Sequence, residues 1–220
     1  QKLAPYPHPH GAVAETMRLA SQKTFDELLA GHIQDYRRYF NRVQLDLGGE
    51  EPAATTDQLL EHYRNSRNGK AARYLEELYF QYGRYLLIAS SREGASPANL
   101  QGTWNCHNDS PWSCGYWHNI NVQMNYWPAE VTGLPECHLP LLKLIASLQE
   151  PGARTAGSYY DAGGWVAHVI TNVWGFTSPG ESAVWGATCS GSAWLCEHLW
   201  EHYAFTQDRE YLEWAYPVMK

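Results

Sequence analysis

The stretch AARYLEELYFQYGRYLLIA, residues 71–89, carries the clearest helical pattern in the chain. Its apolar side chains recur at the spacing of one face of an α-helix. They are Leu75, Leu78, Tyr79, Tyr82, Tyr85, Leu86 and Ala89. The opposite face carries Arg73, Glu77, Gln81 and Arg84. The pattern predicts a helix over 71–91, and because residues 85–90 are apolar nearly all round, we expect that end to be buried.

Similar periodicity extends along the chain on both sides of this stretch, whereas no run alternates with the two-residue period of a strand. The predicted helices are 25–43, 56–66, 71–91, 137–149, 192–206 and 209–220. Residues 1–20 contain three prolines and are expected to form an extended lead-in. Regularity is lost over 97–140 and again over 151–191, and long irregular segments in compact domains commonly carry function. The sequence therefore predicts an all-α fold with long loops.

Composition excludes several classes of protein. Hydrophobic residues make up 44% of the 220 positions, which is typical of a globular chain. No run of about 18 apolar residues is present, so we expect no membrane span. The net charge is -7 without a Lys/Arg run, which argues against a nucleic-acid partner. Five cysteines without a Cys-x-x-Cys pair indicate neither a disulfide framework nor a zinc ribbon, and Cys196 is expected to be a buried free thiol.

One short motif raises a metal alternative. His198-Leu199-Trp200-Glu201-His202 matches the His-x-x-Glu-His pattern of a class of zinc peptidases. On a helix both histidines share a face, where they would hold zinc with Glu201 as the base. A third ligand would have to come from Glu210 or Glu213. The competing interpretation, which we favour, is an ordinary helix with no metal site.

The loop over 98–130 interleaves carboxamides with tryptophans and few full charges. It contains Asn99, Gln101, Trp104, Asn105, Trp112, Asn119, Asn121, Gln123, Asn125 and Trp127. Carboxamides exchange hydrogen bonds with hydroxyl groups, and indole faces stack on the C–H patches of sugars. The pattern favours a carbohydrate site, although asparagine also serves tight turns and tryptophan also fills cores.

Longer runs resemble the catalytic domain of glycoside hydrolase family 95. These runs are ANLQGTWN (98–105), NINVQMNYWPAEVTGLPECHLPL (119–141), GGWVAHVITNVWGF (163–176) and GSAWLCEHLWEHYAFTQD (191–208). Two more, FDELLAGHIQDYRRYFNRVQLDLG (25–48) and LYFQYGRYLLIASSR (78–92), resemble the segment just before that domain. The similarity covers nearly all of the chain from Phe25 onward.

The resemblance implies an inverting exo-glycosidase that removes terminal α-L-fucosyl or α-L-galactosyl residues from oligosaccharides, without a cofactor. It assigns the chain a lead-in and helical linker at 1–50 and the N-terminal part of an (α/α)6 catalytic barrel at 51–220. The family's Asn-x-Asn pair, which helps to activate the attacking water, maps onto Asn119 and Asn121. Together with the chemistry of the loops, it suggests substrate contacts from Trp104, Asn105, Trp112, Trp117, His118, Gln123, His168 and Trp185.

The family's general acid lies in a Ser-Pro-Glu context and its general base in an Asp-Gly-Asn-Phe-Gly context, and neither context occurs here. Ser178-Pro179-Gly180-Glu181 is not the acid motif. We therefore expect a fragment, inactive alone, whose partners are the missing barrel half and the flanking β domains of a secreted or periplasmic parent. The alternative is a helical carbohydrate-binding module that lacks catalysis.

Overall fold

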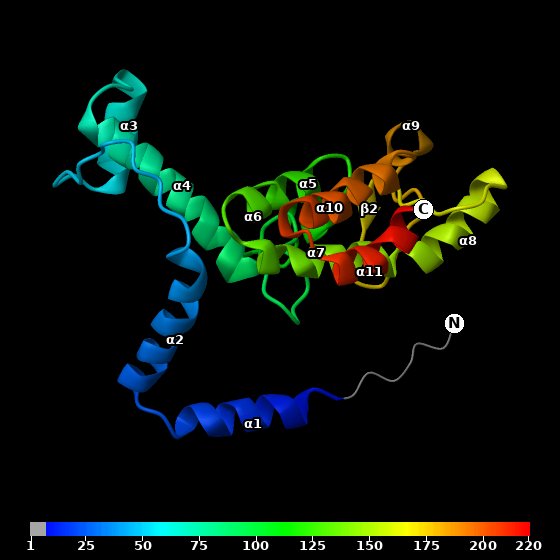
Figure 1. Cartoon of the computed structure of the whole chain (residues 1–220), viewed down its shortest axis with the longest axis horizontal. Coiled ribbons are helices and arrows are strands. Elements are labelled where there is room, and N and C mark those ends of the chain that lie inside the picture. The colour runs from blue at the N-terminus through cyan, green and yellow to red at the C-terminus, as the bar shows by residue number, and fades with distance from the viewer. Residues whose placement is uncertain (1–7) are drawn as a thin grey trace. The chain divides into compact units, whose positions relative to one another are not determined.

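The structure is a computed structural model that describes residues 8–220. It divides into two compact units, residues 1–41 and 42–220, which are considered separately. The described part of the first unit consists of α1 (His10–Ser21) and α2 (Phe25–Phe40) (Figure 1). None of the described helices is both long and apolar enough to cross a membrane.

The first unit corrects one expectation. Residues 10–20, predicted as extended, belong to α1, while residues 1–7 lie outside the described part of the chain. The prolines end at Pro9, and the segment after it is rich in residues that favour helices. The helix predicted over 25–43 is confirmed as α2, which begins at a capping box. Thr24 Oγ1 accepts a hydrogen bond from the Glu27 backbone N–H at 3.3 Å, and the Thr24 backbone N–H donates to Glu27 Oε2 at 2.7 Å.

The second unit is mostly helical. Its elements are α3 (Thr56–Asn65), α4 (Lys70–Ser90), the 3₁₀ turn η1 (Pro111–Cys114), β1 (Tyr116–Trp117), α5 (Asn121–Tyr126), α6 (Pro128–Val131), α7 (Pro135–Ser147), α8 (Gln149–Tyr160), β2 (Ile170–Thr171), α9 (Ala183–Gly186), α10 (Gly191–Thr206) and α11 (Arg209–Met219). The predicted helices 56–66, 71–91, 137–149, 192–206 and 209–220 are confirmed as α3, α4, α7, α10 and α11.

The two stretches predicted as irregular contain additional helices. Helices α5 and α6 lie in the first stretch, whereas α8 begins just before the second and extends into it, and the short α9 lies within it. Helix α8 contains Pro151 and Gly152, which are poor helix formers, so its local sequence gave little indication of it. Glycine is required at this position by the tertiary packing, because a Cβ at Gly152 would lie only 2.9 Å from the Val166 carbonyl oxygen.

Helix α4 shows the limits of a simple face assignment. Leu75, Leu87 and Ile88 are buried as predicted, but Tyr79 is 80% exposed and Arg84 is only 1% exposed. The Arg84 guanidinium is buried because it donates hydrogen bonds to the carbonyl oxygens of Val43 and Thr132, at 2.9 and 3.2 Å. Arg84 is therefore buried although the pattern places it on the face opposite the apolar side chains.

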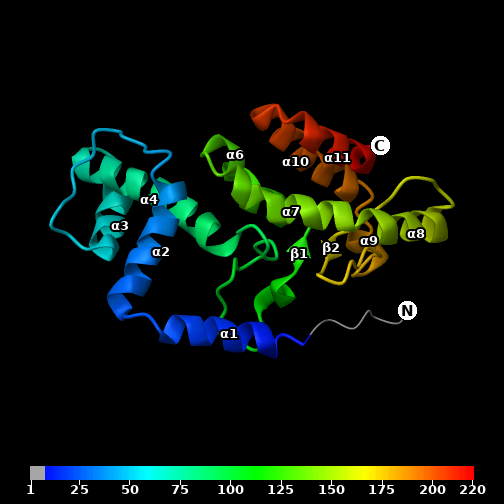
Figure 2. The same ribbon diagram turned by 60° about the horizontal axis from the view of Figure 1, so that its bottom comes forward.

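The core of this unit forms where α10 packs against α7 and α11 (Figure 2). Its fully buried apolar side chains include Leu134, Leu141, Leu142, Ile145, Leu148, Leu195 and Leu199. A buried hydroxyl network joins this core to the ends of α4 and α5. The Ser91 hydroxyl donates to the Cys137 carbonyl oxygen at 2.8 Å, and the Tyr126 hydroxyl accepts from the Ala98 backbone N–H at 2.7 Å.

The free thiols differ in their surroundings. Cys106 and Cys189 are exposed, Cys114 and Cys196 are half-buried, and Cys137 is fully buried. The expectation of a buried Cys196 is thus corrected to a half-buried one at the packing edge of α10. Burial raises the pKa of Cys137 and of Cys196 to about 11.

We predict a graded order of thiol labelling. Because the thiolate is the reacting species, Cys106 and Cys189 should react first near pH 8, Cys196 more slowly and Cys137 last. A time course of alkylation, read by peptide mass mapping, measures the order. The chain unfolded in urea is the control, since all the thiols should then react at similar rates. Native Cys137 reacting as fast as Cys106 would contradict the packing of α7.

Candidate functional site

A pocket of about 300 Å³ lies beside the N-terminus of α5. It is lined by Leu100, Gln101, Trp112, Trp117, Asn119, Asn121 and Trp185. These residues come from three segments that are distant in sequence: the loop after α4, the segment from η1 to α5, and α9. Most of its lining consists of indole rings and carboxamides. The arrangement suits a small polyhydroxylated ligand with apolar faces.

The two asparagines predicted as catalytic both line this pocket. Asn119 lies in the turn before α5 and is exposed, and Asn121 is the first residue of α5 and is half-buried. A turn and the start of a helix therefore hold the pair. Within residues 8–220 neither carboxamide makes a hydrogen bond to another protein group, so both are available to a ligand or to water.

Two tryptophans form a stacked wall. Trp117 lies on β1, which pairs antiparallel with β2 through Trp117 and Ile170. The Trp117 ring lies parallel to the ring of Trp185, with centroids 5.7 Å apart and an interplanar angle of 6°. Trp117 Nε1 also donates to the Trp112 carbonyl oxygen at 3.0 Å. Trp117 is therefore held in place on both sides, as a rigid stacking surface requires.

The rim of the pocket has an unusual backbone. Trp112, Ser113 and Cys114 have φ values of 51°, 55° and 50°, in the left-handed region. This conformation costs roughly 1–2 kcal/mol for each residue that is not glycine. The surrounding contacts, among them the one from Trp117 Nε1, compensate for this cost and place Trp112 at the pocket.

Gln101 is a pocket residue that the sequence did not single out. Its Nε2 donates to the Pro111 carbonyl oxygen at 3.0 Å, which leaves its buried Oε1 without a protein partner. A buried oxygen without a donor is unfavourable unless a ligand or water supplies the hydrogen bond. The only available signal was its place in the run ANLQGTWN, between the residues proposed for the site.

Three predicted contact residues lie behind the pocket and not in its lining. His118 is 1% exposed and its Nδ1 contacts the His168 carbonyl oxygen at 2.9 Å. Gln123 is fully buried and its Nε2 donates to the His118 carbonyl oxygen at 2.6 Å. His168 is also fully buried, with ring nitrogens 2.6 Å from the Thr177 carbonyl oxygen and the Tyr160 hydroxyl. All three support the loops that carry the pocket.

Two further predicted residues lie elsewhere. Trp104 lines a separate cavity beside α4, where its ring is near that of Tyr85. Asn105 is exposed, and its Nδ2 donates to the His107 carbonyl oxygen and to Ser110 Oγ, within the loop. Asn105 thus serves a turn, as asparagine often does. Neither residue belongs to the pocket of the asparagine pair.

The structure does not bring together the zinc ligands that the His-x-x-Glu-His motif suggested. Glu210 and Glu213 are exposed, and the carboxylate that approaches His202 is Glu130, at 2.6 Å. Glu130, His138 and His202 are the group within the described residues whose donor atoms converge closely enough for a metal ion. Glu130 and His138 precede His202 by 72 and 64 residues, so the local motif could not reveal them.

Comparison with known proteins gives a consistent picture. The glycosyl hydrolase family 95 catalytic domain matches residues 24–220. Alpha-L-fucosidase 2 of Arabidopsis thaliana is 43% identical over 201 residues, which cover 90% of this chain and 24% of that protein. Probable alpha-fucosidase A of Aspergillus niger is 37% identical over 216 residues, 97% of this chain and 27% of the relative. The chain thus spans about a quarter of the length of these curated relatives.

The burial of His118 predicts a pH dependence of stability. Burial lowers the pKa of His118 from 6.5 to about 4. Between these values the unfolded chain binds a proton that the folded chain does not, so the free energy of unfolding falls as the pH falls. From pH 7 to pH 5 this group should contribute a loss of about 2 kcal/mol.

Urea unfolding of the wild type and of His118→Asn at both pH values measures this contribution. Asparagine keeps a donor for the His168 carbonyl oxygen but cannot be protonated, so the variant should lose less stability on acidification. His62→Asn, on the exposed face of α3, is the matched control and should behave like the wild type. An unchanged pH slope in His118→Asn would contradict the buried neutral imidazole.

Proposed function

The chain belongs to glycosyl hydrolase family 95, and from this premise we propose that it forms part of an inverting exo-glycosidase that removes terminal α-L-fucosyl or α-L-galactosyl residues from oligosaccharides. The observation that carries the proposal is the pocket that Asn119 and Asn121 line together with the stacked rings of Trp117 and Trp185. The names of the Arabidopsis and Aspergillus relatives favour fucosyl over galactosyl substrates.

The pocket chemistry fits such a sugar. Fucose carries a methyl group and C–H patches that stack on indole rings, as well as hydroxyl groups that need hydrogen-bond partners. The unpartnered Gln101 Oε1 offers an acceptor for a hydroxyl group, and the two asparagine carboxamides offer both donors and acceptors.

In the proposed mechanism Asn119 and Asn121 hold the attacking water. An inverting glycosidase needs an acid on one side of the scissile bond and a base with water on the other, with carboxyl groups about 6.5–9.5 Å apart. A carboxamide does not take up the proton at neutral pH, but its oxygen accepts a hydrogen bond from water and fixes its direction. The asparagines therefore act as positioning groups for the attacking water.

The acid and the base are proposed to come from outside these 220 residues. No Asp or Glu lines the pocket, and the sequence contains neither the Ser-Pro-Glu nor the Asp-Gly-Asn-Phe-Gly context that the family resemblance implies. We propose that residues 51–220 form the N-terminal part of an (α/α)6 barrel, with residues 1–50 as lead-in and linker, and that the other barrel half and flanking β domains complete the enzyme.

A carbohydrate-binding module without catalysis is the second candidate, and the lack of a carboxylate in the pocket lining favours it. Tryptophan fluorescence of the chain titrated with L-fucose tests binding in both cases. Hydrolysis of an α-L-fucosyl oligosaccharide by the longer protein, with release of the β anomer seen by NMR, separates the two. Binding without hydrolysis by the longer protein would support the module, and release of the α anomer would contradict inversion.

We predict that Asn121→Ala in the active longer protein lowers turnover by roughly 100-fold or more. This is the typical effect of removing one preorganised polar group that acts on the transition state. The free energy of unfolding should change little, because the carboxamide makes no protein hydrogen bond among the described residues. Asn68→Ala, in the exposed loop before α4, is the control and should keep full turnover. Equal relative losses of stability and turnover in Asn121→Ala would indicate a structural asparagine instead.

A further inference from the structure

A second constellation of polar side chains lies inside the helical core, apart from the pocket of the asparagine pair. Glu130 of α6 contacts His138 of α7 and His202 of α10 through a single oxygen atom, Oε1. The distances are 2.8 Å to His138 Nδ1 and 2.6 Å to His202 Nδ1. The donor atoms of the three residues all lie within 4.8 Å of one another. Three elements thus bring one carboxylate and two imidazoles to one point.

These three side chains are withdrawn from solvent. The exposed fractions are 3% for Glu130, 1% for His138 and 8% for His202. Burial raises the pKa of Glu130, but the hydrogen bonds from His138 and His202 outweigh it and lower the pKa to about 2. Burial lowers the pKa of His138.

We propose that Glu130, His138 and His202 bind a divalent transition-metal ion, with Zn²⁺ as the expected occupant. Two imidazole nitrogens and one carboxylate are a donor set that suits zinc, whereas Ca²⁺ and Mg²⁺ prefer oxygen ligands alone. A zinc ion would form bonds of about 2.0–2.2 Å to each of these atoms. Glu130 Oε1 now lies 2.8 and 2.6 Å from the two Nδ1 atoms, so the three ligand atoms need to move only slightly apart to admit the ion. This inference is independent of the proposed glycosidase function.

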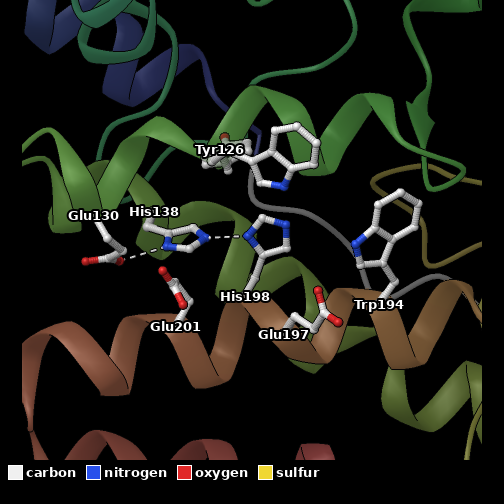
Figure 3. A pocket seen from close by; sticks show the side chains of 8 residues that line it. Tyr126, Glu130, His138, Trp194, Glu197, His198 and Glu201 are labelled. Carbon is white, nitrogen blue, oxygen red and sulfur yellow. Dashed lines mark hydrogen bonds and ion pairs between the residues drawn. The ribbon is translucent and has the colours of Figure 1, made fainter.

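His198 supplies the outer partner that metal-bound histidines usually have. Its Nδ1 lies 2.9 Å from His138 Nε2, the ring nitrogen that points away from Glu130 (Figure 3). With a metal on His138 Nδ1, the proton of that ring resides on Nε2 and is donated to His198. Such outer partners fix the ring orientation and the tautomer of a ligating histidine.

A cavity of about 210 Å³ gives access to this cluster. It is lined by Glu130, His138 and His198 together with Trp194, Glu197 and Glu201 (Figure 3). Glu130 Oε2 accepts no hydrogen bond from the residues between 8 and 220. This oxygen or a water in the cavity can complete the coordination. Glu197 and Glu201 also line the cavity and are exposed, and their carboxylates favour the approach of a cation.

The proposed role is structural: the ion joins α6 and α7 to α10, which contact one another in the core. The competing interpretation is a hydrogen-bonded cluster without metal, in which both Nδ1 atoms carry protons that they donate to Glu130. The two states differ in histidine tautomer, because coordination at Nδ1 transfers the remaining proton to Nε2.

The first experiment uses the wild-type chain, stripped with a chelator and titrated with Zn²⁺ and, separately, with Co²⁺. We expect one ion per chain, a rise in Tm, and a change from Nδ1–H to Nε2–H for His138 and His202 in NMR spectra of the imidazole nitrogens. The Co²⁺ complex should lack a sulfur-to-cobalt charge-transfer band. Absence of binding, unchanged tautomers, or such a band, which would assign the ion to cysteine, would overturn the proposal.

The second experiment compares Glu130→Gln and His202→Gln with His62→Gln. Loss of a direct ligand should weaken Zn²⁺ affinity by at least about 100-fold, since even the loss of an outer hydrogen-bond partner weakens metal affinity by about 10–100-fold. The exposed His62→Gln variant should bind like the wild type. Circular dichroism reports whether each variant folds, and if the ligand variants unfold, the tautomer change in the wild type alone decides. Wild-type affinity in a folded Glu130→Gln variant would refute the assigned ligands.

Discussion

The carboxylate of Glu130 is the constraint on which much of the second unit depends. A charged side chain that is 3% exposed must be compensated by close partners, and Oε1 of Glu130 lies 2.8 and 2.6 Å from Nδ1 of two histidines on different helices. This requirement fixes α10 against α6 and α7. Helix α6 follows α5 directly, so the same contact also determines where α5 lies. The asparagine pair at the start of α5 is thus positioned by a polar contact deep in the core.

The sequence predicted the helices well where an apolar face repeats at helical spacing over several turns. Helices α2, α4 and α11 are of this kind. Periodicity failed for α8, whose proline and glycine are accommodated by packing that only the tertiary structure reveals. It also misplaced Arg84, because a long cationic side chain can be buried when backbone carbonyl oxygens accept its hydrogen bonds. Such partners lie 40 or more residues away in sequence.

The chemistry of the residues predicted only part of the site. Asn119, Asn121, Trp112, Trp117 and Trp185 meet at one pocket, although their roles in binding or catalysis remain predictions. A polar side chain that is close in sequence to the pocket residues can instead form hydrogen bonds with the backbone of the supporting loops. His118, Gln123 and His168 do so. Whether a side chain faces the ligand or the scaffold depends on backbone direction at single residues, which composition and spacing do not specify.

The left-handed backbone of residues 112–114 has a consequence for protein engineering. These residues keep a costly conformation, so replacing Ser113 by glycine would remove a steric penalty and tend to stabilise the folded chain. Glycine would also widen the range of conformations open to the rim and loosen the placement of the Trp112 indole. Thermostability and a sharply defined pocket are therefore opposing demands at this turn. Selection for heat resistance alone would tend to erode the geometry that selection for ligand recognition would preserve.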